Sequence, residues 1–420
     1  MNNKELYKSN GNRLIEILEK HGYEGYFVGG CVRDMIMNRE YTDIDIAASS
    51  LPEITLEIFR NEGYRVIETG MRHGTVTVIM DKMPFEVTTY RIDGEYRDCR
   101  HPEKVEFTLD IIADLARRDF TVNAMAMDRK GNIVDPFGGM EDIRKKTIRA
   151  VGDPYERFRE DALRILRGCR FASTLEFTIE ENTKKAMEEL CPLMEKVAGE
   201  RLFVEFKKLT EGKDCGMVLY KYSHIIDKIL SPAKFTVLLK KYPRFIFYGT
   251  LASIENSFIN ITSALLCLCG GDRNGTLTMV NDFIKRTKCD RYTANSLMYI
   301  TSSVYDPLIT TKKELNREMG KHGIGTVTSC LELRQALYLS EVIPFEEETE
   351  KALKNAAEIT KDGVITLRCL DINGNDLMEA GFRKGKETGE MLNYLMDMVA
   401  EGNIENEKEA LLSCAKQKSL

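Results

Sequence analysis

Residues 29–34 read GGCVRD and residues 43–45 read DID, and these two stretches decide how the first part of the chain folds. The first stretch follows the apolar run Tyr26 to Val28, which predicts a strand that leads into a helix. Glycines at such a turn let backbone N–H groups approach a phosphate closely, so Gly30 is a candidate phosphate contact. Glycine turns are common, however, and the interpretation depends on the residues that accompany this one.

Two acids lie in the second stretch, Asp43 and Asp45, at the start of the strand-like run Ile44 to Ala47. In a strand, residues i and i+2 point to the same face, so the two carboxylates should lie side by side. Neighbouring anions repel each other unless a cation lies between them. Mg²⁺ is suited to this place because it takes carboxylate and phosphate oxygens together in phosphoryl transfer. An acid-rich, solvated loop would give the same pattern.

A third carboxylate is expected from Glu86, which lies in the strand-like stretch Phe85 to Arg91. Phe85 and Val87 point to the opposite face because strand side chains alternate. An exposed glutamate on an edge strand would explain the same pattern. With the further strand-like run Thr75 to Met80, these stretches predict a region that mixes strands and helices.

Residues 117–124 read RRDFTVNA and place two arginines beside an acid and an amide. Arg118 can bind a phosphate, and Asp119 or Asn123 can bind a ribose hydroxyl. The capped start of a helix would have the same composition. The stretch is therefore a candidate nucleotide contact with a structural alternative.

From Pro154 onward the strand signals give way to long amphipathic patterns, so we expect helices in the rest of the chain. Asp161 and Arg164 lie within the pattern Tyr155 to Phe171, where i and i+3 share a face of one continuous helix. The simplest interpretation of this pair is a surface ion pair, which stabilises a helix by only about 0.2–0.5 kcal/mol.

A sharper interpretation is that Asp161 and Arg164 select a nucleobase. Cytosine and adenine both present an amino donor beside a ring-nitrogen acceptor on the Watson–Crick edge, and a carboxylate with a guanidinium complements both. Uracil and guanine present the reverse order and would leave both buried protein groups unpaired. One Asp and one Arg can therefore admit C and A and exclude U and G without a nucleic acid template.

These motifs stand in the order found in class II tRNA nucleotidyltransferases, a family that also includes bacterial poly(A) polymerases. The resemblance covers most of residues 25–205 and is carried by GGCVRD, the Asp43 and Asp45 pair, RRDFTVNA, DPFGGMED and EDALRILRGCRFA. It implies an α+β head of the polymerase-β-type nucleotidyltransferase fold, followed by an all-α neck, body and tail. The expected boundaries are 1–148 for the head, 149–212 for the neck, 213–330 for the body and 331–420 for the tail.

The resemblance also implies roles for individual residues. It places catalytic metal on Asp43 and Asp45, the choice of base on Asp161 and Arg164, and contacts with the incoming nucleotide on Gly30, Arg33, Arg118, Arg167 and Arg170. Arg167 and Arg170 could otherwise be ordinary exposed arginines. Two further matching motifs are expected to be structural, namely Asp135, Gly139 and Asp142 in one and Gly199 to Glu205 in the other.

The expected reaction is addition of C, C and A to the 3′ end of tRNA from CTP and ATP, with Mg²⁺ as cofactor and pyrophosphate as product. Residues 93–102 resemble the flexible loop of full CCA-adding enzymes, which favours completion of the terminal A. A poly(A) polymerase or an A-adding enzyme is the alternative within the family. A non-catalytic RNA-binding protein is disfavoured because both aspartates are present.

The segment 381–389 carries glycines spaced four apart with basic residues between them, and it resembles the C-terminal part of bacterial CCA-adding enzymes. Arg383, Lys384 and Lys386 are the expected RNA contacts, because a loop that leads into a helix suits backbone phosphate. Helix capping with tight packing is the alternative.

Composition agrees with this interpretation. A chain of 420 residues suggests about three units, and its net charge of −6 means that local basic patches must bind any RNA. The 11 scattered cysteines indicate reduced thiols. Apolar runs stay shorter than the roughly 18 residues of a membrane span, so we expect a soluble, cytoplasmic protein without an obligate protein partner.

Overall fold

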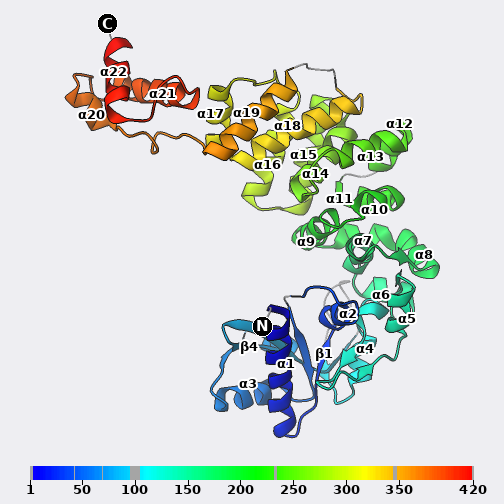
Figure 1. The fold of residues 1–420 in the computed structure, drawn as a ribbon. Coiled ribbons are helices and arrows are strands. Elements are labelled where there is room, and N and C mark those ends of the chain that lie inside the picture. Colours follow the sequence, from blue (N-terminus) through cyan, green and yellow to red (C-terminus); the bar gives the residue numbers. More distant parts are fainter. Residues whose placement is uncertain are drawn as a thin grey trace. The chain divides into compact units, whose positions relative to one another are not determined.

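The computed structural model describes residues 3–41, 43–68, 70–94, 105–230, 234–343 and 348–418. The chain divides into two compact units, Met1–Lys228 and Ile229–Leu420 (Figure 1). The four-part division expected from the sequence stays a prediction. Most of the loop expected at 93–102 lies outside the described residues.

A seven-stranded mixed sheet forms the base of the first unit, in the order β3-β4-β5-β2-β1-β8-β9. Strands β2 and β5 are parallel, and all other neighbouring pairs of this sheet are antiparallel. The strands are β1 Gly25–Val28, β2 Asp45–Ala48, β3 Arg65–Ile67, β4 Thr75–Met80, β5 Met83–Thr89, β8 Ala126–Met127 and β9 Ile133–Val134. The α+β head is therefore confirmed.

Helices and two small sheets complete the head. The helices are α1 Asn3–Lys20, α2 Gly30–Ile36, α3 Pro52–Asn61, α4 Ile111–Ala116 and α5 Gly139–Arg144, with 3-10 turns η1 Met71–His73 and η2 Thr121–Asn123. Strand β6 Arg91–Asp93 pairs with β7 Val105–Phe107, and β10 Thr147–Ile148 pairs with β11 Thr178–Ile179. Burial alternates along β4, and Val76, Phe85 and Phe27 lie in one core with α1. This alternation is what fixes which strand face carries polar groups.

Helices follow the head to the end of the first unit. They are α6 Pro154–Glu160, α7 Leu163–Leu175, α8 Glu181–Leu190, the 3-10 segment η3 Cys191–Lys196, α9 Gly199–Thr210, α10 Cys215–Lys221 and α11 Ser223–Leu230, which carries the boundary between the units. Helices α7 and α9 pack against each other. This packing brings two distant stretches of sequence to one site.

The continuous helix expected over Tyr155 to Phe171 is wrong, because the chain breaks between α6 and α7. Asp161 has extended backbone angles, φ −144° and ψ 102°. Its carboxylate accepts a hydrogen bond from the Leu163 N–H at 3.1 Å, as a residue at a helix start does. The side chain thus competes with helical geometry for a backbone donor, and Asp161 and Arg164 do not share the face of one helix.

All the regular secondary structure in the described part of the second unit is α-helical, as expected. Its helices are α12 Lys234–Lys241, α13 Arg244–Ala252, α14 Phe258–Gly270, α15 Arg273–Thr287, α16 Arg291–Ser303, α17 Lys312–His322, α18 Ile324–Leu339, α19 Thr349–Asp362, α20 Gly374–Glu379, α21 Lys386–Ala400 and α22 Lys408–Lys418. One core joins α17, α18 and α19, and another joins α20, α21 and α22. The described part of the chain contains no helix long and apolar enough to cross a membrane.

Candidate nucleotidyl-transfer site

Two of the three expected carboxylates lie on adjacent strands. Asp45 is the first residue of β2 and pairs in register with Glu86 of β5. Glu86 is exposed between buried Phe85 and Val87, as the alternation predicted. Asp43 lies just before β2 and is exposed, so it belongs to the loop that enters the strand. The parallel pairing of β2 with β5 is therefore what brings Glu86 to Asp45.

Negative charge is crowded around the Asp45 carboxyl. Although Asp45 is exposed by surface area, loss of solvation around its carboxyl raises its pKa to about 6, and the negative charges of Glu86 and Asp43 add to this effect. The Arg118 guanidinium opposes it. A bound cation would relieve the crowding of negative charge, and carboxylate oxygens suit Mg²⁺.

The described residues contain no group of three His, Cys, Asp or Glu side chains arranged to hold a metal on their own. Mg²⁺ is usually bound by one or two carboxylates together with substrate phosphates. The acidic donor set of Asp43 and Asp45 therefore fits a metal that is completed by a triphosphate.

The glycine turn before α2 keeps an arginine close to these acids. Gly29 has φ +77°, and a Cβ there would lie 3.1 Å from Arg118 Nη1 and 3.7 Å from Asp45 Oδ2. Arg118 is held from behind by Asp114, whose Oδ2 lies 3.0 Å from Arg118 Nη2. Gly29 thus gives the side chains of Arg118 and Asp45 room beside the turn.

A cavity of about 480 Å³ lies next to the carboxylates within the first unit. It is rich in positive charge and is lined by Gly29, Gly30, Arg33, Asp45, Arg117, Arg118, Asp119, Asn123, Asp161, Leu163, Arg164, Arg167, Arg170, Phe171 and Arg201. Every expected nucleotide contact is in this set. The structure therefore brings together residues from α2, the RRDF motif and α7.

Arg167 and Arg170 are held by buried acids. Arg167 Nε donates to Asp119 at 2.8 Å, and Glu205 of α9 accepts from Arg167 at 3.2 Å and lies 2.9 Å from Arg170. All three guanidiniums of Arg33, Arg167 and Arg170 lie near the Phe171 ring. These arginines are not ordinary exposed residues, because only 31% of the Arg167 side chain and 13% of the Arg170 side chain are exposed.

Burial changes the pKa values of acids and of arginines in this network in opposite directions. It would raise the pKa of Asp119, but Arg167 and the hydrogen bond from Asn123 outweigh it and lower that pKa to about 2. Burial and the positive charge of Arg167 lower the pKa of Arg170 to about 10, against the opposing charge of Glu205. Such crowding of positive charge favours an anionic ligand.

The base-selecting candidates lie on the same cavity but have separate partners. Arg164 Nη1 donates to Glu160 at 2.5 Å and to the Arg157 carbonyl at 3.1 Å. The Asp161 carboxylate accepts two hydrogen bonds from Arg201, at 3.2 and 2.8 Å. The two side chains are therefore held independently, and neither is a simple surface ion pair with the other.

Asp119 and Asn123 lie deeper than the sequence suggested. Asn123 Oδ1 accepts from Arg33 Nη1 at 2.6 Å, and Asn123 Nδ2 donates to Asp119 at 3.2 Å. Both residues are buried and connect arginines that line the cavity. Their polar atoms orient Arg33 and Arg167 in this structure.

The motif around Asp135, Gly139 and Asp142 has the expected structural contacts. The Asp135 carboxylate accepts from the N–H groups of Gly139 and Met140, at 2.7 and 2.9 Å, and so caps α5. Asp142 accepts from the Thr121 hydroxyl at 2.7 Å. Helix α5 is thereby fixed against the turn that carries the RRDF motif.

Sequence reasoning missed Arg201 and Glu205 as parts of the site, because it assigned their motif a structural role. Arg117 and Phe171 were also missed as cavity residues. Nothing in the local pattern indicates that α9 packs on α7, and only the tertiary structure reveals it.

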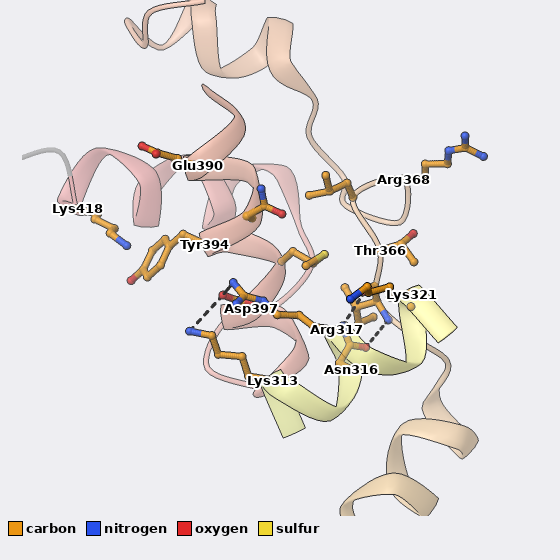
Figure 2. A pocket seen from close by; sticks show the side chains of 15 residues that line it. Lys313, Asn316, Arg317, Lys321, Thr366, Arg368, Glu390, Tyr394, Asp397 and Lys418 are labelled. Carbon is orange, nitrogen blue, oxygen red and sulfur yellow. Dashed lines mark hydrogen bonds and ion pairs between the residues drawn. The ribbon is translucent and has the colours of Figure 1, made fainter. Parts of the chain in front are cut away.

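A second cavity, of about 1110 Å³, lies within the second unit between α17 and α21 (Figure 2). Lys313, Arg317 and Lys321 recur every four residues along α17, and Arg368 and Lys418 add further positive charge. Asp397 of α21 pairs with Arg317 and with Lys313, the latter at 3.2 Å. Lys321 and Arg368 carry the cationic character on the other side of the cavity.

The expected RNA contacts at the start of α21 are exposed. Arg383 and Lys384 lie in the turn before the helix, and Lys386 is its first residue. Gly385 precedes the helix with φ +109°, a conformation that favours glycine. The glycine-spaced segment therefore leads into a helix as predicted.

Paired carboxylates on a mixed sheet, beside an arginine-lined cavity, define a nucleotidyltransferase. Residues 25–149 match the poly(A) polymerase head domain family, residues 176–216 the family described as "Probable RNA and SrmB-binding site of polymerase A", and residues 272–415 the tRNA nucleotidyltransferase domain 2 family. The head thus carries the family's catalytic fold, and two further segments match RNA-related families.

Relatives specify the family further. The chain is 36% identical to the CCA-adding enzyme of Streptococcus suis over 96% of this chain and 95% of that one, and 34% identical to that of Enterococcus faecalis over 96% and 94%. A crystal structure of the Bacillus stearothermophilus CCA-adding enzyme in complex with CTP superposes with a TM-score of 0.73 and 30% identity, covering 98% of this chain and 97% of that one. The chain belongs to the CCA-adding enzymes.

The Thermotoga maritima CCA-adding enzyme complexed with tRNA_CCA shares the fold, with a TM-score of 0.58 and 20% identity over 98% of this chain and 95% of that one. Family membership is therefore settled by the closer bacterial relatives, and this structure supports the architecture alone.

Proposed function

We propose that this chain adds C, C and A to the 3′ end of tRNA from CTP and ATP, without a template. The observation that carries the proposal is the single cavity on which Asp45, the arginines and both base-selecting candidates converge. One pocket then holds the reacting phosphate and the base of the same nucleotide. The acceptor is proposed to be the 3′-hydroxyl of the tRNA, because the relatives that match nearly the whole chain are CCA-adding enzymes.

The reaction joins the RNA 3′-oxygen to the α-phosphorus and breaks the bond from that phosphorus to the oxygen that leaves with pyrophosphate. Arg33, Arg118 and Arg167 hold the triphosphate through charge-assisted hydrogen bonds. Arg170 adds a fourth guanidinium beside them. Because these groups are fixed by Asp119, Asn123, Asp114 and Glu205, they are oriented before the nucleotide enters.

Asp43 and Asp45 would hold Mg²⁺, with Glu86 beside Asp45. When bound, the metal would stabilise negative charge on the attacking and leaving oxygens. The carboxylates of this chain would hold the metal at the beginning of strand β2. Glu86 is proposed to orient or supplement this pair.

Base selection is proposed to rest on Asp161 as acceptor and Arg164 as donor. C and A offer both complementary groups, whereas U and G would set a carbonyl against the Asp161 carboxylate and an N–H against the Arg164 guanidinium. Each mismatch therefore weakens the binding of the wrong nucleotide by more than the loss of a single weak contact would. Two residues in one pocket suffice for both correct bases.

RNA is proposed to bind through local clusters, because the net charge of −6 gives no general attraction. Arg383, Lys384 and Lys386 form one such cluster. The cationic row of Lys313, Arg317 and Lys321 forms a second (Figure 2). A cytoplasmic location is part of the proposal, because no disulfide joins any of the ten cysteines among the described residues.

The test supplies purified protein and Mg²⁺ with tRNA that lacks its 3′ end, and with CTP alone, ATP alone or both. Three added nucleotides of sequence C-C-A, formed only with both substrates, are the expected product on sequencing. Long adenylate tails on unrelated RNA would assign a poly(A) polymerase instead. Incorporation of ATP only onto tRNA that already ends in CC would assign an A-adding enzyme.

A further inference from the structure

The two base-selecting side chains are held in different ways. Arg164 is fixed by Glu160, by the Arg157 carbonyl and, through Nη2, by the Arg117 carbonyl at 3.1 Å. Its acceptors come from α6, where Glu160 also lies, and from the residue that follows α4. The donor half of the pair is thus anchored at several points.

The acceptor half has fewer supports. Asp161 lies between α6 and α7 and has extended backbone angles. Within the described residues its carboxylate accepts from the Leu163 N–H and from Arg201. Arg201 contributes two of these three hydrogen bonds, one to each oxygen, in the parallel arrangement that a guanidinium makes with a carboxylate.

Both members of this ion pair border the nucleotide cavity. About 16% of the Asp161 side chain and 27% of the Arg201 side chain are exposed. Arg201 lies in the first turn of α9, and α9 packs along α7. The orientation of Asp161 is therefore set by an element that is far away in sequence.

We propose that Arg201 is a positioning residue for nucleotide choice, which holds the Asp161 carboxylate in the orientation that accepts the amino group of C or A. This inference rests on the proposed function. A fixed carboxylate penalises the carbonyl that U and G present at that point, because it cannot turn away. A carboxylate released by loss of Arg201 can rotate, and the penalty falls.

Arg201→Ala is expected to lower the ratio of kcat/KM for CTP to that for UTP, and the ratio for ATP to that for GTP, by about tenfold, or roughly 1.4 kcal/mol, because the released carboxylate can turn away from a mismatched carbonyl. Arg201→Lys keeps the charge but cannot make two parallel hydrogen bonds, so it should give an intermediate ratio. The primers are tRNA without its 3′ end for CTP and UTP, and tRNA ending in CC for ATP and GTP.

Two controls separate positioning from other effects. Glu205→Gln, one turn further along α9, removes the negative charge that pairs with Arg167 and Arg170. It should slow the incorporation of all four nucleotides alike without changing either ratio. Arg144→Ala removes an exposed ion pair with Glu141 in the head and should leave the ratios unchanged. Circular dichroism and thermal melting report whether each variant folds.

A double-mutant cycle decides whether Arg201 acts through Asp161. In an Asp161→Ala background, Arg201→Ala should change the ratios by less than about threefold, since the group it positions is gone. An equal effect in both backgrounds would mean that Arg201 reads the nucleotide directly, and it would overturn the inference. The inference would also be overturned if the Arg201→Ala protein incorporates all four nucleotides more slowly by the same factor, with unchanged ratios.

The inference and the proposed function fail in different ways. If the Arg201→Ala protein is folded but too slow to assay, the ratio is measured as equilibrium binding of CTP against UTP. If the Arg201→Ala protein does not fold, the Arg201→Lys protein is used in its place. A wild-type protein that incorporates neither CTP nor ATP would reject the proposed function. Wild-type CCA addition with full selectivity retained in both Arg201 variants would reject the positioning role alone.

Discussion

At the scale of single residues, Asp45 is where the interactions of the site converge. It pairs in register with Glu86, lies beside the Gly29 turn that accommodates Arg118, and has its pKa raised to about 6 by lost solvation and by neighbouring carboxylates. A bound cation relieves the repulsion between neighbouring carboxylates, so a carboxylate in these surroundings favours cation binding. Its contribution to the reaction can be separated from its contribution to binding.

Asp45→Asn should abolish nucleotide incorporation and leave tRNA affinity nearly unchanged, because it removes a metal-binding charge but no expected RNA contact. A bound metal stabilises the transition state by several kcal/mol, so the loss should be about a thousandfold or more. Single-turnover incorporation and filter binding measure the two quantities. Glu53→Gln, an exposed acid on α3, is the matched control, and turnover within tenfold of wild type would reject the metal assignment.

Asp119 should affect stability through pH. Its pKa is about 2 in the folded protein, below the ordinary value near 3.9, so its charge stabilises the fold above about pH 4, and this contribution is lost as pH falls towards 2. Asp119→Asn should therefore reduce the free energy of unfolding at pH 7 by about 2 kcal/mol. The difference from wild type should shrink below pH 4 in urea unfolding. A difference that is constant from pH 7 to pH 3 would contradict this origin.

At the scale of elements, the sequence predicted the parts whose pattern is local. Alternation gave β4 and the exposed side of Glu86, and the glycine turn gave α2. The break between α6 and α7 was missed because apolar periodicity continues across it, and a side-chain hydrogen bond at Asp161 decides the backbone there. Arg201 and Glu205 were missed as site residues because the packing of α7 on α9 is non-local.

Helix α5 and the RRDF turn should be sensitive to added volume at Gly139. A Cβ there would lie 2.3 Å from the Thr121 carbonyl oxygen and 2.9 Å from the Met125 sulfur, and the backbone oxygen cannot simply rotate away. Gly139→Ala should lower the free energy of unfolding by about 1–3 kcal/mol. Chemical denaturation measures this change.

The matched control for Gly139 is Gly249→Ala in α13, where a Cβ would meet nothing within 4 Å. Alanine has the higher helix propensity by up to about 1 kcal/mol, so this variant should be neutral or more stable. Equal destabilisation by both substitutions would mean that the packing around Gly139 is not the cause.

At the scale of the whole molecule, charge is unevenly distributed. The chain has a net charge of −6, yet seven arginines line the nucleotide cavity, and basic residues recur along α17 and at the start of α21. The sequence alone predicted the basic cluster of Arg383, Lys384 and Lys386 but not the row along α17. Their proximity to cavities and helix ends depends on packing, which a local pattern does not encode.

Replacing Arg383, Lys384 and Lys386 together with alanine should weaken tRNA binding and make it less dependent on salt. Removing one cation that neutralises a phosphate lowers the slope of log affinity against log salt by roughly 0.9, so the slope should fall by about 2–3. Filter binding from about 50 to 200 mM salt tests this. CTP binding serves as the control and should be unchanged, and an unaltered salt slope would exclude this cluster from RNA binding.

The parallel pairing of β2 with β5 also determines when activity appears during folding. The chain must cross over through α3, β3 and β4 before Asp45 and Glu86 can meet, and such non-local pairing forms later than local helices. During refolding from denaturant, the helical signal should therefore appear first, and nucleotide incorporation should return only when the centre of the sheet has found its register. The return of activity thus reports when this long-range pairing has formed in the first unit.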